Sequence, residues 1–356
     1  HKFSRTVGKY RRSTLCRTGY QPKPGIFYRV LSEDMFDLRC RNSVGWLAAG
    51  ILLTSCQSGA VTPSATESGP TRTIEHAMGN AEVPVSPQRV VTLDTAPLDA
   101  ALALGIKPVG TAIYGQIPEY LGERVDGIGI IGDASQPNLE TILQFNPDII
   151  LGTKLSLKEQ YTQLSQMAPT VLTEGSGRAG DWQENLKLYA EALGQSEQAE
   201  QRLQQYQQHV QRLQDTIGQP QTLELSVLIV TKDSVRASTT GSFSGSVLQD
   251  VGFSRTPAQD DEQGYSLPLS SEALDTLDGD YIFLIHSTYR PGGVQKAEFM
   301  THPVWSQLEA VQQGRVCEVT LDVWLAGRNI LAANQILADV EECLKQTSLG
   351  QAVNSG

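Results

Sequence analysis

The chain has 356 residues, of which 40% are hydrophobic and 19% are charged, a composition typical of a folded protein large enough for two cores. Its net charge is −11, and residues 56–356 alone carry −18, which argues against a nucleic-acid partner, because such partners attract basic surfaces. The sequence has no C-x-x-C motif or histidine cluster, so no structural zinc site is expected.

The first segments resemble an export and anchoring signal. Residues 1–34 show no clear period and are interpreted as an upstream extension or an artefact. Residues 35–55 combine a basic start with an apolar run too short to span a bilayer, which predicts a lipoprotein signal peptide. The run ends in Leu-Thr-Ser-Cys, which resembles a bacterial lipobox, so Cys56 is expected to be acylated; a plain signal peptide or a short buried helix is the alternative.

The predicted mature chain starts with a tether and is strongly acidic. Residues 56–73 are small and polar with Pro and Gly, which predicts a flexible tether at a membrane surface. Residues 1–55 hold 10 of the 28 Lys and Arg and 3 of the 39 Asp and Glu, which leaves 18 basic and 36 acidic residues and a net charge of −18. Cys317 and Cys343 would then be two unlipidated cysteines in an oxidising compartment, where either a disulfide or two buried thiols is possible.

Residues 74–195 are predicted to form an N-terminal α/β lobe. Short apolar runs alternate with helical patterns, which is typical of a parallel sheet covered on both faces. In such sheets ligands bind beyond the carboxyl ends of the strands. The expected strands are 89–93, 107–112, 148–151 and 170–172, and the expected helices are 97–104, 138–145, 158–167 and 181–193.

Residues 196–218 are predicted to contain a long linking helix over 196–217. Apolar residues at steps of four and three place one stripe along it: Ala199, Leu203, Tyr206, Val210, Leu213 and Ile217. Ser196 suits an N-cap, and Gly218 ends the pattern. Taken alone, the stripe also fits a surface helix or a short coiled coil. Its position between two α/β segments favours a strut between lobes.

Residues 219–346 are predicted to form a second α/β lobe, followed by a flexible tail at 347–356. The expected strands are 225–231, 281–285 and 315–320, and the expected helices are 245–251, 271–277, 304–311 and 326–345. One pattern recurs in both lobes, with a helix-starting Glu eight residues before an Asp that precedes an apolar strand. Glu140 and Asp148 thus match Glu272 and Asp280, which suggests two lobes of one architecture.

Several stretches together carry a family resemblance over roughly residues 72 to 345. They are PQRVVTLD, NLETILQFNPDIIL, APT, LSSEALDTLDGDYIF, HPVWSQLEAVQQGRV and the terminus around Trp324. In order and spacing they resemble the iron-siderophore substrate-binding proteins of ABC transporters, whose lobes are joined by one rigid helix. The resemblance implies two Rossmann-like lobes with a ligand cleft between them, and a periplasmic or extracytoplasmic, lipid-anchored monomer.

The resemblance also implies partners. The protein would bind a ferric siderophore, whose own oxygens hold the iron, and would deliver it to an ABC-transporter permease dimer. It would need no cofactor, perform no chemistry, and touch the membrane only through its lipid anchor. In the family a Glu on each lobe docks to permease arginines, and Glu140 and Glu272 match those positions. Without the family, each would be a helix-starting acid stabilised by the helix dipole.

The expected ligand residues are arginines and aromatic residues in loops after strands, because many ferric siderophores are anionic and partly aromatic. They are Tyr114, Arg178, Trp182, Arg236, Tyr289, Arg290, Trp324 and Arg328. For any one of them a surface or core position is an alternative. His286 is expected to be a packed or surface residue, and no protein–metal site is predicted.

Two other functions remain open at this stage. Cobalamin or haem could replace the siderophore within the same class of transporter protein, and haem would favour a Tyr or His ligand in the cleft. An exported enzyme with two Rossmann-like lobes would share the α/β pattern. The chain has no phosphate loop or acid–base arrangement in the context that such chemistry needs, which argues against the enzyme.

Overall fold

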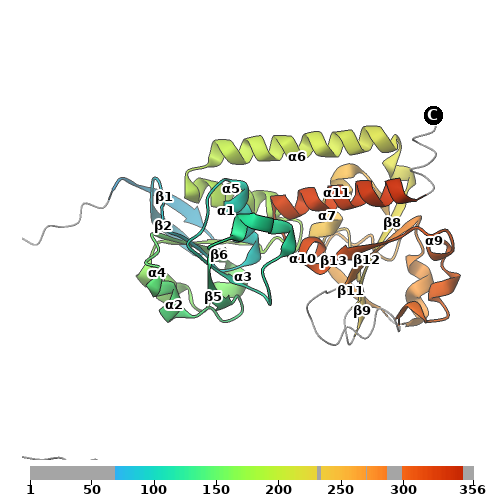
Figure 1. Ribbon diagram of the computed structural model, residues 1–356, viewed down its shortest axis with the longest axis horizontal. Helices are drawn as coiled ribbons and strands as arrows, with labels where there is room; N and C mark the ends of the chain where they lie inside the picture. The colour runs from blue at the N-terminus through green and yellow to red at the C-terminus, as the bar shows by residue number, and fades with distance from the viewer. Residues whose placement is uncertain (1–68, 231–233, 270, 287–298, 348–356) are drawn as a thin grey trace, which may run out of the picture. The chain divides into compact units, whose positions relative to one another are not determined.

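The computed structural model describes residues 69–230, 234–269, 271–286 and 299–347, without the side chains of Ser271 and Glu272. These residues form two α/β lobes joined by α6 (Figure 1). No helix among them is long and apolar enough to cross a membrane.

The N-terminal lobe contains a parallel five-stranded sheet. Its strands lie in the order β5-β4-β3-β6-β7. They are β3 (Val90–Thr92), β4 (Gly110–Ile113), β5 (Gly129–Asp133), β6 (Ile149–Thr153) and β7 (Thr170–Thr173). Its helices are α1 (Thr95–Ala103), α2 (Leu139–Gln144), α3 (Lys154–Leu157), α4 (Tyr161–Met167) and α5 (Trp182–Leu193), with a 3₁₀ segment, η1 (Glu119–Val125). This confirms a parallel sheet, but β5 was not predicted.

A hairpin precedes this sheet and was also missed. β1 (Thr71–His76) pairs antiparallel with β2 (Gly79–Pro84). Residues 71–73, expected in the tether, therefore belong to a strand. Only two β1 side chains, Ile74 and His76, are buried, so the apolar signal was weak.

The C-terminal lobe has a mixed sheet in the order β11-β9-β8-β12-β13, and β10 also pairs with β8. Its strands are β8 (Glu224–Val230), β9 (Val235–Ser238), β10 (Ser254–Arg255), β11 (Ser266–Leu269), β12 (Tyr281–His286) and β13 (Val316–Thr320). β9 is antiparallel to both of its neighbours, while β8, β12 and β13 run parallel. The helical segments are η2 (Pro220–Thr222), α7 (Phe243–Val251), η3 (Ser271–Leu277), η4 (Trp305–Gln307), α9 (Glu309–Gln312), α10 (Leu321–Trp324) and α11 (Ile330–Gln346).

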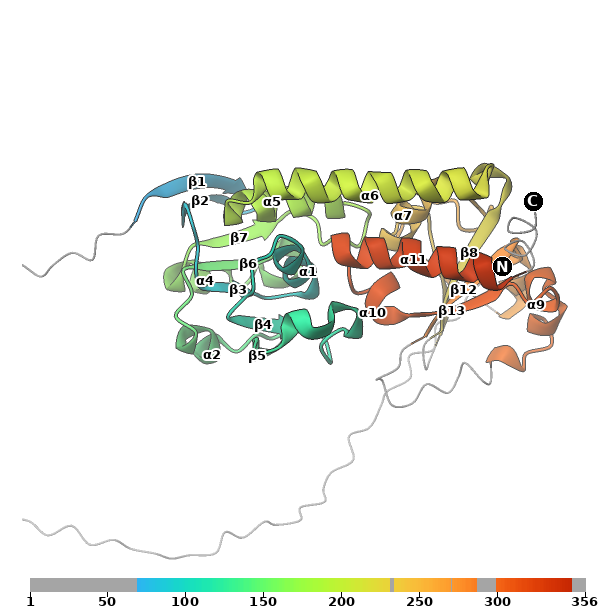
Figure 2. The same ribbon diagram turned by 45° about the horizontal axis from the view of Figure 1, so that its top comes forward.

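α6 (Ser196–Ile217) covers the range that the apolar stripe predicts and contacts both lobes. The Arg202 Nε donates to Ala103 O of the N-terminal lobe at 2.9 Å. One turn later, Tyr206 Oη donates to Asp250 Oδ2 of the C-terminal lobe at 2.7 Å. Figure 2 shows α6 running along α5, α7 and α11. One apolar core extends from the N-terminal lobe under α6 into the C-terminal lobe, so the strut is packed along its length.

The repeated acidic residues have matching positions. Asp148, before β6, accepts hydrogen bonds from Gln88 N and Arg89 N, at 2.6 and 2.9 Å. Asp280, before β12, accepts from Glu224 N at 2.8 Å. In each lobe this carboxylate therefore fixes the beginning of the neighbouring strand, β3 or β8.

The predicted terminal helix 326–345 is wrong at its start. α10 ends at Trp324, and α11 begins only at Ile330, with Asn329 as its N-cap. Between them Arg328 has φ 54°, in the left-handed region that ends a helix. The reason is tertiary, because the Arg328 guanidinium reaches into the other lobe, as described next.

Candidate functional site

A cavity of about 520 Å³ lies between the lobes. From the N-terminal lobe it is bordered by residues after β4 and before α5, and from the C-terminal lobe by the ends of β8 and β13 and their neighbours. This is the position at which sheets of this kind bind ligands. The residues that line it are Tyr114, Arg178, Ile229, Arg236, Ser242, Phe243, Tyr265, Ser266, Leu321, Trp324, Leu325, Ala326 and Arg328.

Two half-buried arginines face this cavity from opposite lobes. Arg178 precedes α5, and its guanidinium has no hydrogen bond or ion pair within the part of the chain that the structure describes. Arg236 lies on β9, and among the described residues its guanidinium donates to Ser266 alone, from Nη2 to Oγ at 2.8 Å, from Nε to Oγ at 3.1 Å and from Nη2 to the carbonyl O at 3.1 Å. None of the described residues that line the cavity is a carboxylate. Both positive charges are therefore available to an anionic ligand.

Tyrosines provide a polar and aromatic edge. Tyr114 follows β4, and its hydroxyl lies 3.2 Å from Ser156 Oγ. Tyr265 begins the approach to β11 and is 48% exposed, which is high for so large a side chain. Tyr265 was missed because β9 and β11 are short strands without a strong apolar pattern. The N-cap Ser242, which accepts from Gly245 N at 2.9 Å, was missed because α7 was expected to begin two residues late.

Trp324 is a buried part of the cavity wall. The side chain is fully buried, its ring stacks on Phe283 at 4.8 Å and 22°, and its Nε1 donates to Asp339 Oδ2 at 2.8 Å. The indole is thus fixed on both its face and its edge. It shapes the cavity wall and has little surface to offer a ligand.

Arg328, expected from the sequence to bind the ligand, lines the cavity, and its guanidinium also links the two lobes. The guanidinium is 2% exposed, forms an ion pair with Asp94 of the N-terminal lobe, and donates to Ser176 O at 2.8 Å. Burial alone would lower the pKa of Arg328, but Asp94 outweighs it and keeps the pKa above its usual value. Gly177 permits this approach, since a Cβ there would lie 2.5 Å from Arg328 O.

A family model described as "Periplasmic binding protein" matches residues 90–322. The chain belongs to this family. It is 32% identical to the "Probable siderophore-binding lipoprotein YfiY" of Bacillus subtilis (strain 168), over 85% of this chain and 97% of that one. It is also 32% identical to the achromobactin-binding periplasmic protein of Dickeya dadantii (strain 3937), over 71% and 85% of the two chains.

A solved structure gives the same result for the fold. Staphylococcus aureus SirA complexed with staphyloferrin B matches this periplasmic binding protein with a TM-score of 0.69 and 30% identity. The match covers 77% of this chain and 99% of SirA. It confirms the two-lobed α/β architecture expected from the sequence.

Trp182 does not line the cavity of this periplasmic binding protein, contrary to the sequence expectation. It is fully buried at the lobe junction. Its ring meets Tyr206 of α6 edge-on at 5.0 Å and Phe243 of α7 edge-on at 6.4 Å. Trp182 therefore packs the two lobes against the linking helix, and only Phe243 of this group borders the cavity.

The remaining predicted residues are distributed as follows. Glu140 lies exposed in the first turn of α2. Tyr289, Arg290, Cys56 and the side chain of Glu272 lie outside the described residues. Cys317 of β13 and Cys343 of α11 form a disulfide, with their Cα atoms 5.9 Å apart.

His286 was expected to be packed or to lie at the surface. His286 ends β12 and lies 3.6 Å from Glu318, and His209 of α6 lies 3.1 Å from Glu341 of α11. In the ranges that the structure describes, no three His, Cys, Asp or Glu side chains come together as a metal site.

Proposed function

We propose that this protein captures a ferric siderophore outside the cytoplasm and delivers it to an ABC-transporter permease. The observation that carries the proposal is the pair Arg178 and Arg236, which face one cavity from opposite lobes. An anionic ferric complex held between them would neutralise both charges and contact both lobes at once. Iron would enter as cargo inside the siderophore, so the protein itself would need neither a metal site nor a cofactor.

The relatives support this choice of ligand. YfiY and the Dickeya protein are named for siderophore and achromobactin binding, and the Fe(3+)-citrate-binding protein YfmC of Bacillus subtilis is 28% identical over 83% of this chain. The charge distribution supports it as well. The predicted mature chain has a net charge of −18, so two cavity arginines without a carboxylate partner among the described residues form a positive site in an otherwise acidic protein.

Location and delivery complete the proposal. Acylated Cys56 would anchor a monomer to the outer face of the membrane, as the "lipoprotein" and "periplasmic" names of relatives suggest. Glu140 and Glu272 would dock to basic residues of the permease, one from each lobe. Binding and release would then be the whole activity, without a catalysed reaction.

The test is a titration of the exported protein, followed by tryptophan fluorescence and calorimetry. Ferric citrate, ferric hydroxamate and ferric catecholate complexes, cobalamin and haem would be compared. We expect at least one anionic ferric complex to bind. Arg178→Ala and Arg236→Ala should each weaken binding by about tenfold or more, because each removes a charge-assisted contact.

Arg212→Ala is the matched control, since Arg212 is exposed on α6 away from the cavity. Its affinity should equal that of the unmodified protein. Preferential binding of cobalamin or haem would overturn the siderophore proposal. Equal losses of affinity in Arg178→Ala and Arg212→Ala would show that the ligand does not bind in this cavity.

A further inference from the structure

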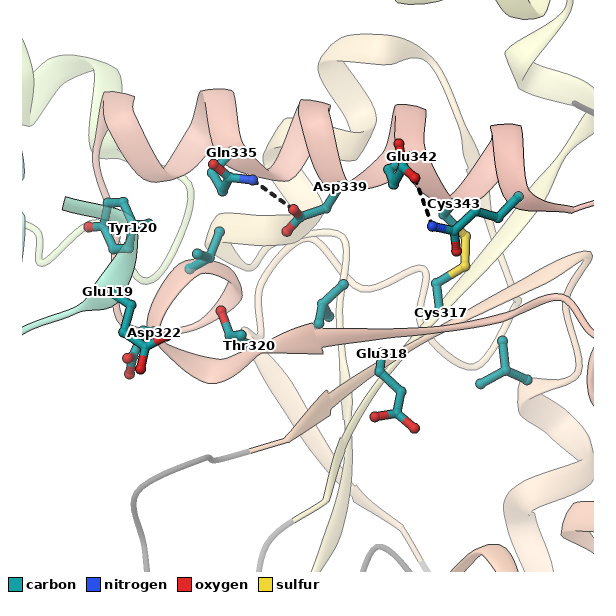
Figure 3. A pocket seen from close by; sticks show the side chains of 14 residues that line it. Glu119, Tyr120, Cys317, Glu318, Thr320, Asp322, Gln335, Asp339, Glu342 and Cys343 are labelled. Carbon is teal, nitrogen blue, oxygen red and sulfur yellow. Dashed lines mark hydrogen bonds between the residues drawn. A yellow bond between two sulfur atoms is a disulfide. The ribbon is translucent and has the colours of Figure 1, made fainter. Parts of the chain in front are cut away.

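A second cavity, of about 610 Å³, lies beside α10, which also contributes to the first (Figure 3). Asp322 and Val323 of α10 line this second cavity, whereas Leu321 and Trp324 line the first. Its other walls are the sheet-edge strand β13, one face of α11, and η1 of the N-terminal lobe. The cavity is therefore built from both lobes, like the first, but by different side chains.

The described side chains that line this cavity carry charge of one sign. Among the described residues that line it, five are carboxylates and none is Lys, Arg or His: Glu119, Glu318, Asp322, Asp339 and Glu342. Three of them have partners. Asp339 accepts from Trp324 Nε1 and Gln335 Nε2, both at 2.8 Å, Glu342 accepts from Gln346 Nε2 at 2.7 Å, and Glu318 lies 3.6 Å from His286 Nε2.

Asp322 is different. It is 6% exposed, it lines the cavity, and its carboxylate has no hydrogen bond or ion pair to any described residue. The charge that acts on it is that of another acid, Glu119 of the opposite lobe, and Figure 3 shows the two together at one end of the cavity. Burial, and then the charge of Glu119, raises the pKa of Asp322 to about 6. With no protein donor in the described parts of the chain, this carboxylate depends on the solvent of the cavity for hydrogen bonds, and a cation in the cavity would be a stronger partner.

The arrangement also indicates the shape of the cation. The described residues bring no three acidic or histidine side chains together as a metal site, which disfavours one compact metal ion. Instead the polar side chains follow α11 from Gln335 to Gln346, a distance of about 16 Å at 1.5 Å per residue. A long ligand with several separated positive charges matches this distribution.

We propose that this acidic cavity binds a linear aliphatic polyamine, with one ammonium group held between Glu119 and Asp322. The remaining ammonium groups would lie along α11 toward Glu342. Each ammonium supplies donors, which is what the unpartnered Asp322 lacks. Because Glu119 and Asp322 belong to different lobes, the bound ammonium would join the lobes at a point where like charges otherwise face each other. This site does not depend on the siderophore proposal.

The experiment is calorimetric titration of the folded, exported protein with spermidine, in low-salt buffer near neutral pH and without siderophore. Asp322→Asn and Glu119→Gln each remove one charge with little change of shape. Glu200→Gln is the matched control, because Glu200 is an exposed acid on α6 outside the cavity. Thermal unfolding of each variant verifies that it is folded.

We expect saturable 1:1 binding of spermidine. Asp322→Asn and Glu119→Gln should each weaken it about tenfold or more, and Glu200→Gln should leave it unchanged. Absence of binding at millimolar spermidine, or equal weakening by Glu200→Gln, would overturn the proposal. Two other outcomes would also overturn it. Magnesium binding with the same sensitivity to Asp322→Asn would show an inorganic cation site. Binding of tetralysine but not spermidine would show a protein-docking site.

Discussion

The carboxylate of Asp99, in α1 of the N-terminal lobe, accepts a hydrogen bond from Leu331 N at 2.9 Å, in the first turn of α11 of the C-terminal lobe. Its other oxygen accepts from Ala332 N at 3.0 Å and from Tyr120 Oη at 2.9 Å. An acid of one lobe thus satisfies the first amides of a helix in the other lobe. Together with the Asp94–Arg328 pair, this makes a second connection between the lobes, independent of α6.

The Asp94–Arg328 pair should be important for stability. Arg328→Met removes the cation and leaves Asp94 buried without its partner, so we expect the free energy of unfolding to fall by about 3–5 kcal/mol. Urea unfolding measures this. The double variant Asp94→Asn/Arg328→Met should recover part of the loss. A loss below about 1 kcal/mol in the single variant would contradict the role given to the pair.

The disulfide should stabilise the C-terminal lobe. Cys317 and Cys343 are 26 residues apart, and closing such a loop is worth roughly 3 kcal/mol in the loop-entropy model. We expect the double variant Cys317→Ser/Cys343→Ser to unfold at lower urea than the oxidised protein. The reduced unmodified protein should behave like the variant. Identical unfolding of the oxidised and reduced protein would be the contrary result.

Asp322 should make stability fall as pH rises. Its pKa is raised in the folded protein to about 6, so the folded state holds a proton that the unfolded state has released between about pH 4 and pH 6. Stability from this group is therefore full below its unfolded pKa and is lost as pH rises through about 6. Asp322→Asn should unfold like the unmodified protein at pH 4 and be more stable at pH 7.5. If Asp322→Asn were less stable than the unmodified protein at pH 7.5, the prediction would be wrong.

Glu140 should affect transport and not ligand affinity. It is exposed on α2 and does not line the interlobe cavity. Under the proposed docking role, Glu140→Ala should reduce uptake of the ferric complex in cells and leave calorimetric affinity unchanged. We expect the same of Glu272→Ala. Glu184→Ala, an acid at the start of α5, is a control for nonspecific effects of charge. Weakened ligand affinity in Glu140→Ala would show that the docking assignment is wrong.

Ligand loading should produce little movement between lobes. α6 contains neither Pro nor Gly, and bending a packed helix without them strains its hydrogen bonds. The contacts of Asp94 and Asp99 add a second constraint. Small-angle scattering of free and loaded protein should therefore give nearly equal radii of gyration. A large compaction on loading would show that these contacts open in solution.

Much of the fold could be predicted because its signals are local. The apolar stripe predicts α6 with its bounds, and short apolar runs predict the central parallel strands. The hairpin, β5, β9 and β11 were missed because their strands are short, exposed on one side, or polar. The break before α11 could not be predicted, since Arg328 leaves the helical region to reach Asp94, a residue 234 positions away.

The cavity could be predicted only in part. Placement after a strand or before a helix led to Tyr114, Arg178 and Arg236, because the parallel topology brings these loops to one side of each lobe. The same placement rule predicted Trp182 as a ligand residue. It is instead covered by the linking helix, and sequence position alone does not show which element covers a side chain. No sequence pattern predicted the acidic cavity. Its key pair, Glu119 and Asp322, comes from segments about 200 residues apart that only the lobe contact brings together.

The lobe contacts also set the order in which the protein can mature. Asp94 and Asp99 precede their partners by 234 and 232 residues, so an N-terminal half leaving a ribosome or export channel carries both carboxylates without them. Burying either one at that moment would cost several kcal/mol. Both carboxylates therefore stay in water until the second lobe covers them, and residues 328–332 supply their partners only when nearly all of the two lobes has emerged. Docking of the lobes is thus a late step, in which two acids leave water and gain their donors together.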